Sequence, residues 1–164
     1  MSARPDLEPL RLGVAGLGMA GAVMVHAAAA HAGFALRGAA DPQLGPRHAF
    51  TRDHDAPAYP DVGELCADPA IEAIYIATPH QYHAPHAILA AEHGKHILLE
   101  KPMALSLADC RAMTEAAEAA GVRLIVGPSH SYDPPIARTA DLIASGEHGA
   151  LRMITALNFT DFLY

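Results

Sequence analysis

A glycine-rich segment near the start of the chain has the spacing of a phosphate-binding loop. Glycines stand at 16, 18 and 21, between an apolar run at 10–15 and an alanine-rich stretch that begins at Met19. The first glycine would allow a tight turn, the second would admit a pyrophosphate close to the main chain, and the third would let a helix pack against a strand. Amides at the start of that helix would hold the phosphates. We therefore predict that a dinucleotide binds to Gly16, Gly18, Met19, Ala20 and Gly21. The alternative is an ordinary strand-to-helix turn.

An acidic residue follows the second apolar run. Asp41 stands twenty residues after Gly21, where a carboxylate can accept hydrogen bonds from the hydroxyls of an adenosine ribose. Because this carboxylate would repel a 2′-phosphate, we expect NAD in preference to NADP. Arg47 is near enough in the sequence to pair with such a phosphate, so NADP remains an alternative. Asp41 could also be a solvated turn aspartate before Pro42.

Two polar clusters follow later apolar runs and could carry a reaction. The sequences TPHQYH at 78–83 and EKP at 100–102 stand at the carboxyl ends of predicted strands, where open parallel sheets bind their ligands. Lys101 could hydrogen-bond a substrate hydroxyl and assist proton transfer, while Glu100 could orient or neutralise the lysine. The alternative is an ordinary surface lysine.

Histidines at 80, 83 and 86 raise the question of a metal site. Metal ligands usually converge from more than one element, whereas this spacing crosses a loop–helix junction, so we expect no metal. We predict instead that His80 and His83 lie near a ribose or the substrate and that His86 lies on a helix surface. His130, at the end of the last apolar run of the series, is a candidate on the substrate side.

The elements that must position these residues alternate between strands and helices, which predicts a parallel sheet flanked by helices. The predicted strands are 10–15, 34–40, 71–77, 96–99 and 122–126, and the predicted helices are 19–32, 43–54, 61–67, 84–93 and 106–120. Further along, Asp133 and Pro134 begin a helix that ends at Gly146, and residues 151–160 alternate as a strand with unequal faces does. We therefore predict a doubly wound α/β domain over 1–127. At 128–164 we expect a connector helix and the first strand of an incomplete second domain, whose open sheet is mixed or antiparallel.

Composition limits the class of protein. The chain has 164 residues, of which 51% are hydrophobic and 18% charged, a balance that excludes an intrinsically disordered protein. A net charge of −7 argues against nucleic acid or an anionic membrane as partner. No apolar run reaches the ~18–20 residues that a membrane span needs, and the amino terminus lacks a signal-type apolar segment. Cys66 and Cys110 lack metal or redox spacing, so we interpret both as small buried side chains in a reducing, cytoplasmic protein.

Five motifs in this order and spacing resemble the glucose–fructose oxidoreductase/inositol dehydrogenase/MocA family: GVAGLGMAG (13–21), AADP (39–42), IATPHQYH (76–83), LLEKP (98–102) and LIVG (124–127). The similarity extends from Leu10 to Tyr164, and the third and fourth motifs together are its most specific part. The resemblance implies a Rossmann domain followed by an α/β substrate domain whose open sheet commonly mediates homo-oligomerisation. It also implies an NAD(P)-dependent oxidoreductase acting on a small molecule such as a sugar, cyclitol or cyclic diol.

The resemblance also implies roles for individual residues. Thr78, Pro79, His80 and His83 would lie near the nicotinamide ribose. Glu100 and Lys101 would face the nicotinamide and the reacting hydroxyl, with Lys101 assisting proton transfer during hydride transfer. In this family a cis bond often precedes the proline that corresponds to Pro102.

Two departures from the family pattern are informative. His80 stands where the family usually has asparagine, and GPSHSYDP at 127–134 replaces an asparagine-x-arginine-phenylalanine pattern. Together with the ending NFTDFLY at 158–164, this segment resembles aromatic cis-dihydrodiol dehydrogenases of the phthalate type. Because the family takes a second acid–base group from the substrate domain, we expect the chain alone to bind a dinucleotide but to turn over poorly. The alternatives are a non-catalytic dinucleotide sensor or regulatory module, and a glycoside hydrolase that uses NAD for transient oxidation.

Overall fold

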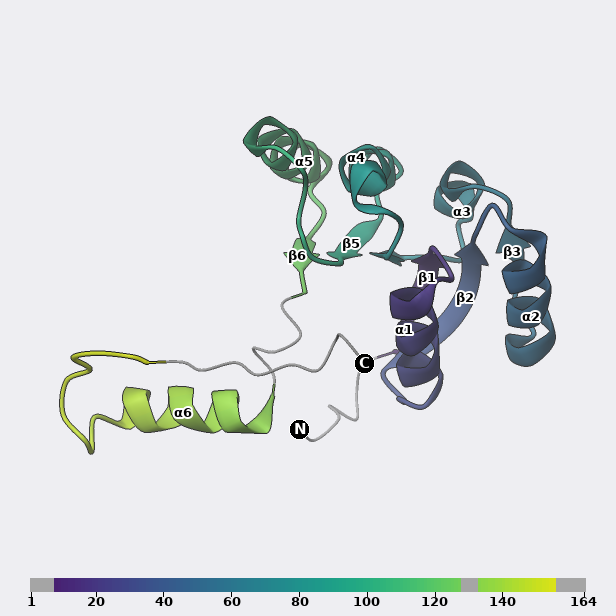
Figure 1. Cartoon of the computed structure of the whole chain (residues 1–164). Helices are drawn as coiled ribbons and strands as arrows, with labels where there is room; N and C mark the ends of the chain where they lie inside the picture. Colours follow the sequence, from purple (N-terminus) through teal and green to yellow (C-terminus); the bar gives the residue numbers. More distant parts are fainter. Residues whose placement is uncertain (1–7, 128–132, 156–164) are drawn as a thin grey trace, which may run out of the picture. The chain divides into compact units, whose positions relative to one another are not determined.

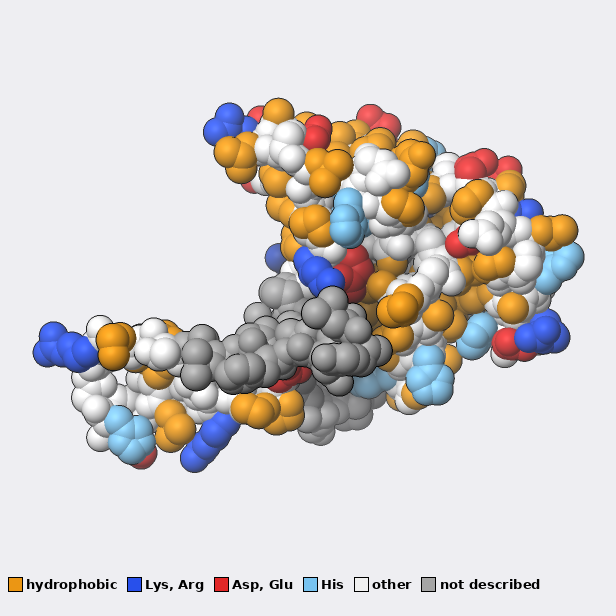
Figure 2. All heavy atoms as spheres, viewed as in Figure 1, with side chains coloured by type: hydrophobic (Ala, Val, Ile, Leu, Met, Phe, Trp, Pro, Cys, Tyr) orange, Lys and Arg blue, Asp and Glu red, His pale blue; other side chains and the backbone are white. Residues whose placement is uncertain are grey.

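The structure is a computed structural model that describes residues 8–127 and 133–155 (Figure 1). The chain divides into two compact units, residues 1–127 and residues 128–164. No helix of the described residues has the length and apolar character needed to cross a membrane. On the face shown in Figure 2, the lysine and arginine side chains are dispersed over the first unit and do not gather in one patch.

The first unit contains a sheet of six strands in the order β3-β2-β1-β4-β5-β6, and all neighbouring pairs are parallel. The strands are β1 Leu10–Ala15, β2 Phe34–Ala40, β3 Ala58–Tyr59, β4 Ala73–Ile76, β5 His96–Leu99 and β6 Leu124–Val126. The strand order reverses between β1 and β4, which in a doubly wound sheet opens a ligand crevice at the carboxyl ends of these strands. The predicted Rossmann-type α/β fold is confirmed, although β3 is an additional strand that the sequence did not predict.

Helices cover both faces of this sheet. They are α1 Met19–Ala29, α2 Leu44–His54, α3 Val62–Ala67, the 3-10 helix η1 His80–Tyr82, α4 His83–Glu92 and α5 Leu107–Ala120. Leu65, Ala87 and Met113 belong to one apolar core, which α3, α4 and α5 bury along one face of the sheet (Figure 1). Val25 of α1 and Phe50 of α2 belong to the second core, on the other face. The two buried faces explain why β4 and the second half of β1 contain no polar side chain except the Tyr75 hydroxyl.

Capping residues define several helix ends. The Asp61 side chain accepts a hydrogen bond from the Glu64 amide at 2.9 Å, and Ser106 caps α5 in the same way at 3.1 Å. Both caps are as predicted and supply acceptors for amides that have no partner within the helix. Helix α1 ends at Ala29, earlier than predicted, because the chain turns so that the Gly33 amide donates to Nδ1 of His31.

The second unit contains helix α6, Pro134–Ser145, which begins after Asp133 and ends at Gly146 with a φ of 69°. The predicted helix is therefore confirmed. The strand predicted from residue 151 is not formed over 151–155, and 156–160 lie outside the described residues. A strand is stable only when a neighbour satisfies its main-chain groups, and the described part of this unit contains no strand.

The two cysteines are both free thiols. Cys66, on the core-facing side of α3, is buried as predicted, and burial raises the pKa of its thiol to about 11. Cys110 is only partly buried on α5, because the face of the helix that packs on the sheet carries Met113 and Ala117.

Candidate active site at the carboxyl edge of the sheet

The fold requires glycine at two of the three loop positions and leaves open space at the third. Gly16 has a φ of +91°, and a Cβ added there would lie 2.7 Å from the Ala77 carbonyl oxygen. A Cβ at Gly21 would lie 1.8 Å from the Gly16 carbonyl oxygen, so these two positions are required by the fold itself. A Cβ at Gly18 would meet no atom within 4 Å. Since the fold leaves this space open, Gly18 is suited to admit a ligand close to the main chain.

The amino end of α1 has the features of an anion-binding site. Gly18 is its capping residue and provides no side-chain cap, so no side chain occupies the first helical amides. The Met19 side chain is 89% exposed and leaves the main chain at the helix start uncovered. Amides of this kind bind phosphate oxygens, which the helix dipole also favours. The phosphate-binding role of Met19 and Ala20 stays a prediction, and it concerns their main-chain amides.

A cavity of about 640 Å³ lies beside this loop, a volume within the range of small-molecule and cofactor sites. Segments that are distant in the sequence form its wall, which includes Gly16, Gly18, Asp41, Thr78, Pro79, Tyr82 and His86. The structure thus brings together five of the predicted cofactor-binding residues. The other predicted residues do not line this cavity: Met19, Ala20, Gly21, His80, His83, Glu100 and Lys101.

Asp41 connects the glycine loop to the end of β2. Its side chain is only 7% exposed, with Oδ2 accepting from the Leu17 amide at 2.9 Å and Oδ1 from the Gln43 amide at 2.8 Å. Each carboxylate oxygen keeps a lone pair that could accept a further hydrogen bond. Nη1 of Arg47 donates to the main-chain oxygens of Asp41 and Pro42, at 2.6 and 2.9 Å. Asp41 is therefore a fixed anion at the cavity, with an arginine nearby.

His83 lies beneath the loops and not at the cavity surface. Its side chain is fully buried, with Nδ1 2.8 Å from the Pro102 oxygen and Nε2 2.9 Å from the Thr78 oxygen. A neutral imidazole carries one N–H, so both contacts are hydrogen bonds only when both nitrogens are protonated. The ribose contact predicted for His83 stays a prediction, and in the structure its ring connects the two polar clusters. The Lys101–Pro102 peptide bond is cis, as the family resemblance implied.

His86 and Tyr82 form part of the cavity wall. Nδ1 of His86 lies 3.0 Å from the Thr78 hydroxyl oxygen, and its ring stacks on Tyr82 with centroids 5.6 Å apart. Burial, followed by the charge of His83, lowers the pKa of His86. The prediction of a helix-surface role for His86 is wrong, and the sequence analysis gave Tyr82 no role. Which face of α4 meets the cavity depends on the turn at η1, which the spacing of histidines does not show.

His80 is exposed at the start of η1, and its ring packs edge-on against His83 with centroids 5.5 Å apart. Within 8–127 and 133–155, no group of three or more His, Cys, Asp or Glu side chains could hold a metal ion. His130 lies outside the described residues, so its proposed substrate-side role stays a prediction.

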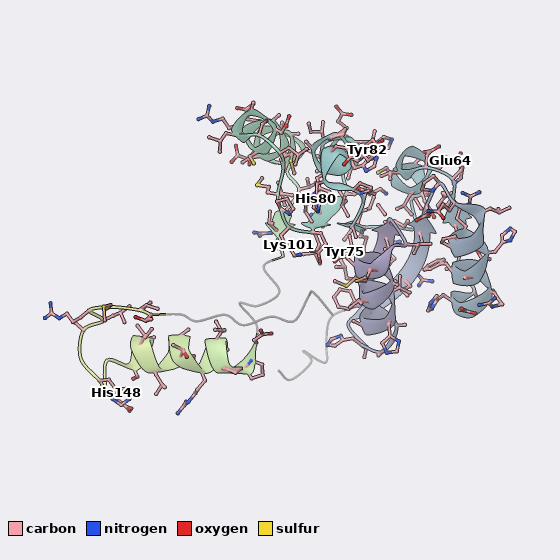
Figure 3. All side chains as sticks on the ribbon, in the orientation of Figure 1. Glu64, Tyr75, His80, Tyr82, Lys101 and His148 are labelled. Carbon is pink, nitrogen blue, oxygen red and sulfur yellow. The ribbon has the colours of Figure 1, made fainter. Side chains whose placement is uncertain are left out.

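The second polar cluster contains a hydrogen bond that the sequence analysis missed. The Tyr75 hydroxyl donates to Oε1 of Glu100, and the Lys101 amide donates to Oε2 at 3.1 Å. Burial raises the pKa of Tyr75, so its hydroxyl remains a donor across the physiological range. Figure 3 shows the side chains of Tyr75 and Lys101 near each other at the sheet edge. A tyrosine inside a buried strand usually needs a partner for its hydroxyl, and this signal could have identified Tyr75.

The Lys101 ammonium makes no hydrogen bond or ion pair within the described part of the chain. Glu100 therefore contacts the main chain of Lys101 and does not neutralise its charge directly. An exposed, unpaired lysine next to a fixed carboxylate can give a proton to a ligand oxygen or take one from it.

Comparisons with known proteins agree with this geometry. Residues 10–128 match the family described as "Oxidoreductase family, NAD-binding Rossmann fold". A relative from Comamonas testosteroni, 1-carboxy-3-chloro-3,4-dihydroxycyclohexa-1,5-diene dehydrogenase, is 46% identical over 156 residues, which are 94% of this chain and 39% of the relative. The chain thus spans well under half the length of this relative.

Two solved structures resemble the fold closely. The WlbA dehydrogenase from Bordetella pertussis, in complex with NADH and UDP-GlcNAcA, is 27% identical with a TM-score of 0.79, over 86% of this chain and 43% of that one. GenD2 from gentamicin A biosynthesis, in complex with NAD, is 29% identical with a TM-score of 0.80, over 86% of this chain and 40% of that one.

Proposed function

Because this chain belongs to the oxidoreductase family with an NAD-binding Rossmann fold, the family first indicated by its motifs, we propose that it is the cofactor-binding part of an NAD(P)-dependent dehydrogenase. The observation that carries this proposal is the open space at Gly18, facing a cavity that Asp41 also lines. The fold does not need a glycine at that position, whereas a pyrophosphate approaching the main chain does. We further propose that the reaction transfers a hydride between nicotinamide and a carbinol carbon of the substrate.

The residues present fit a dinucleotide along the sheet edge. The first amides of α1 suit the pyrophosphate, Asp41 suits the ribose diol of the adenosine half, and Thr78 and Pro79 would face the second ribose. The nicotinamide of a bound cofactor would supply or accept the hydride. In that reaction Lys101 would move the proton at the substrate oxygen, while Glu100 holds the main chain of Lys101 in place. His83 supports both segments through its two carbonyl contacts.

The charge of Asp41 favours NAD over NADP. Its carboxylate is held at the cavity by two main-chain amides and would repel a 2′-phosphate at short range. Nη1 of Arg47 already donates to two main-chain oxygens beneath the aspartate. NADP binding would therefore require the remaining guanidinium nitrogens to outweigh the carboxylate.

The substrate that we propose is a cyclic diol carrying a carboxylate, within the broader class of sugars, cyclitols and cyclic diols. The similarity to the Comamonas testosteroni dehydrogenase supports it, since that relative is named for such a compound and matches 94% of this chain. We also propose that residues 128–164 begin a substrate domain through which the protein forms homo-oligomers, and that the protein is cytoplasmic. Its reducing surroundings would keep both cysteines as the free thiols observed.

A titration of the chain with NADH, followed by nicotinamide fluorescence, tests the cofactor proposal. We expect saturable binding that ADP-ribose competes away and that is tighter than the binding of NADPH. Absence of saturable binding would refute the cofactor role. Assays of the natural protein with candidate diols, with Lys101→Ala as the comparison, test the reaction: equal rates would remove the role proposed for Lys101.

A further inference from the structure

The hydrogen bond from Tyr75 to Glu100 holds a negative charge at the nicotinamide end of the proposed cofactor site. We propose that Tyr75 is a positioning residue that fixes the Glu100 carboxylate beside the nicotinamide, and that this fixed charge favours the oxidised over the reduced cofactor. This inference rests on the proposed function, because it concerns the same site. It adds a determinant of the relative affinity for NAD⁺ and NADH.

The sheet register brings the two side chains together. Tyr75 of β4 pairs with Leu98 of β5, and Glu100 follows Leu98 by two residues, which places Tyr75 and Glu100 on the same face of the sheet. The Tyr75 residue is 4% exposed and belongs to the apolar core on the α1 face. Its hydroxyl extends from this core to the carboxylate at the end of β5. A phenylalanine would fill the same core, so the hydroxyl serves the contact with Glu100.

Both oxygens of the Glu100 carboxylate are restrained, and from different directions. Oε1 accepts from Tyr75 and Oε2 from the Lys101 amide. A glutamate without such partners samples several rotamers, so the mean position of its carboxylate lies further into solvent. With two donors the charge stays at the sheet edge beside Lys101. The Lys101 ammonium does not pair with it directly within the described residues.

A charge at this position distinguishes the two redox forms of the cofactor. NAD⁺ carries a positive nicotinamide ring and NADH a neutral one, whereas their ADP-ribose portions are the same. A fixed carboxylate nearby therefore stabilises bound NAD⁺ relative to bound NADH. A unit-charge interaction near a protein surface changes this affinity ratio by roughly threefold to tenfold. The Lys101 ammonium acts in the opposite direction.

Dissociation constants of NAD⁺, NADH and ADP-ribose, measured for the 164-residue chain and its variants, test the inference. We expect Glu100→Gln to raise the ratio Kd(NAD⁺)/Kd(NADH) by roughly threefold to tenfold. Tyr75→Phe should raise the ratio by less, because the carboxylate keeps its charge and its hydrogen bond from the Lys101 amide. The Kd of ADP-ribose should change less than twofold in both variants. The double variant should match Glu100→Gln alone, because Tyr75 acts through Glu100. Lys101→Met should lower the ratio.

Tyr59→Phe is the matched control, since the Tyr59 hydroxyl donates to Asp68 at 2.8 Å and involves neither Glu100 nor Lys101. It should leave the ratio unchanged. An unchanged ratio in Tyr75→Phe or Glu100→Gln, with normal ADP-ribose binding, would overturn the inference and leave the proposed function standing. Glu100→Gln alone decides the question if Tyr75→Phe does not fold. Failure of the unmodified chain to bind all three ligands would overturn the proposed function and this inference with it.

Discussion

Replacing Gly18 with alanine should separate ligand binding from folding. The position has a φ of −67°, which alanine adopts without strain, and the added Cβ would meet no atom within 4 Å. Glycine is a better N-cap than alanine, which costs the folded state some stability, whereas the unfolded chain loses conformational freedom, an effect of about 0.4–1 kcal/mol in the opposite direction. We therefore expect the free energy of unfolding to change by less than about 1 kcal/mol. The same Cβ would project where the main chain should admit the pyrophosphate.

The expected loss of affinity follows from the contacts that the Cβ displaces. A hydrogen bond from an amide to a charged group contributes about 1.5–3 kcal/mol. Loss of one such bond at the start of α1 predicts NADH binding about tenfold to a hundredfold weaker. Fluorescence titration gives the affinity, and urea denaturation gives the free energy of unfolding of the same samples.

Gly21→Ala is the contrasting variant. Its Cβ would lie 1.8 Å from the Gly16 oxygen, so the main chain must move and we expect a destabilisation of about 1–3 kcal/mol or more. The reasoning about Gly18 would be refuted if Gly18→Ala bound NADH as tightly as the unmodified chain. It would also be refuted if Gly18→Ala unfolded as readily as Gly21→Ala.

Three further predictions concern other parts of the first unit. Asp41→Asn should weaken NADH binding roughly tenfold, because it removes a charged hydrogen-bond acceptor. It should also reduce the ratio of NADPH to NADH dissociation constants, which paired titrations measure. Burial lowers the pKa of His86 in the folded chain, so as the pH falls the unfolded chain protonates this histidine before the folded chain does. The stability that neutral His86 contributes should therefore be fully present above about pH 6.5 and decline at lower pH. His86→Gln should therefore flatten the fall in unfolding free energy between pH 7.5 and 5.5, and an equal slope in both proteins would contradict this. Nζ of buried Lys95 donates to the Asp68 and Ile71 carbonyls at 2.8 Å each, so Lys95→Met should cost about 1–3 kcal/mol in the free energy of unfolding without changing NADH affinity.

The sequence predicted the elements whose signals are local. Strands β1, β2 and β5 have the predicted bounds because predominantly apolar runs between turn residues mark buried parallel strands. The caps of α3 and α5 were also predicted, since a capping residue acts within one turn. Strand β3 was missed because two residues carry no periodicity, and only its pairing with β2 makes it a strand.

The site was harder to predict where roles depend on the direction of a side chain. The spacing of His83 and His86 is visible in the sequence, but the turn at η1 buries the first and brings the second to the cavity. Tyr75 was missed because its partner Glu100 follows another strand, β5, and only the register of β4 against β5 brings the two together. By contrast, the loop glycines and Asp41 were found because strand, turn and helix follow one another directly in the chain.

A crystal structure of the chain with NADH would test the central claim most directly. We expect the pyrophosphate on the first amides of α1 beside Gly18, the adenosine ribose on Asp41, and the nicotinamide at Glu100 and Lys101. A cavity without the cofactor at saturating NADH, or a nicotinamide bound away from Lys101, would contradict it.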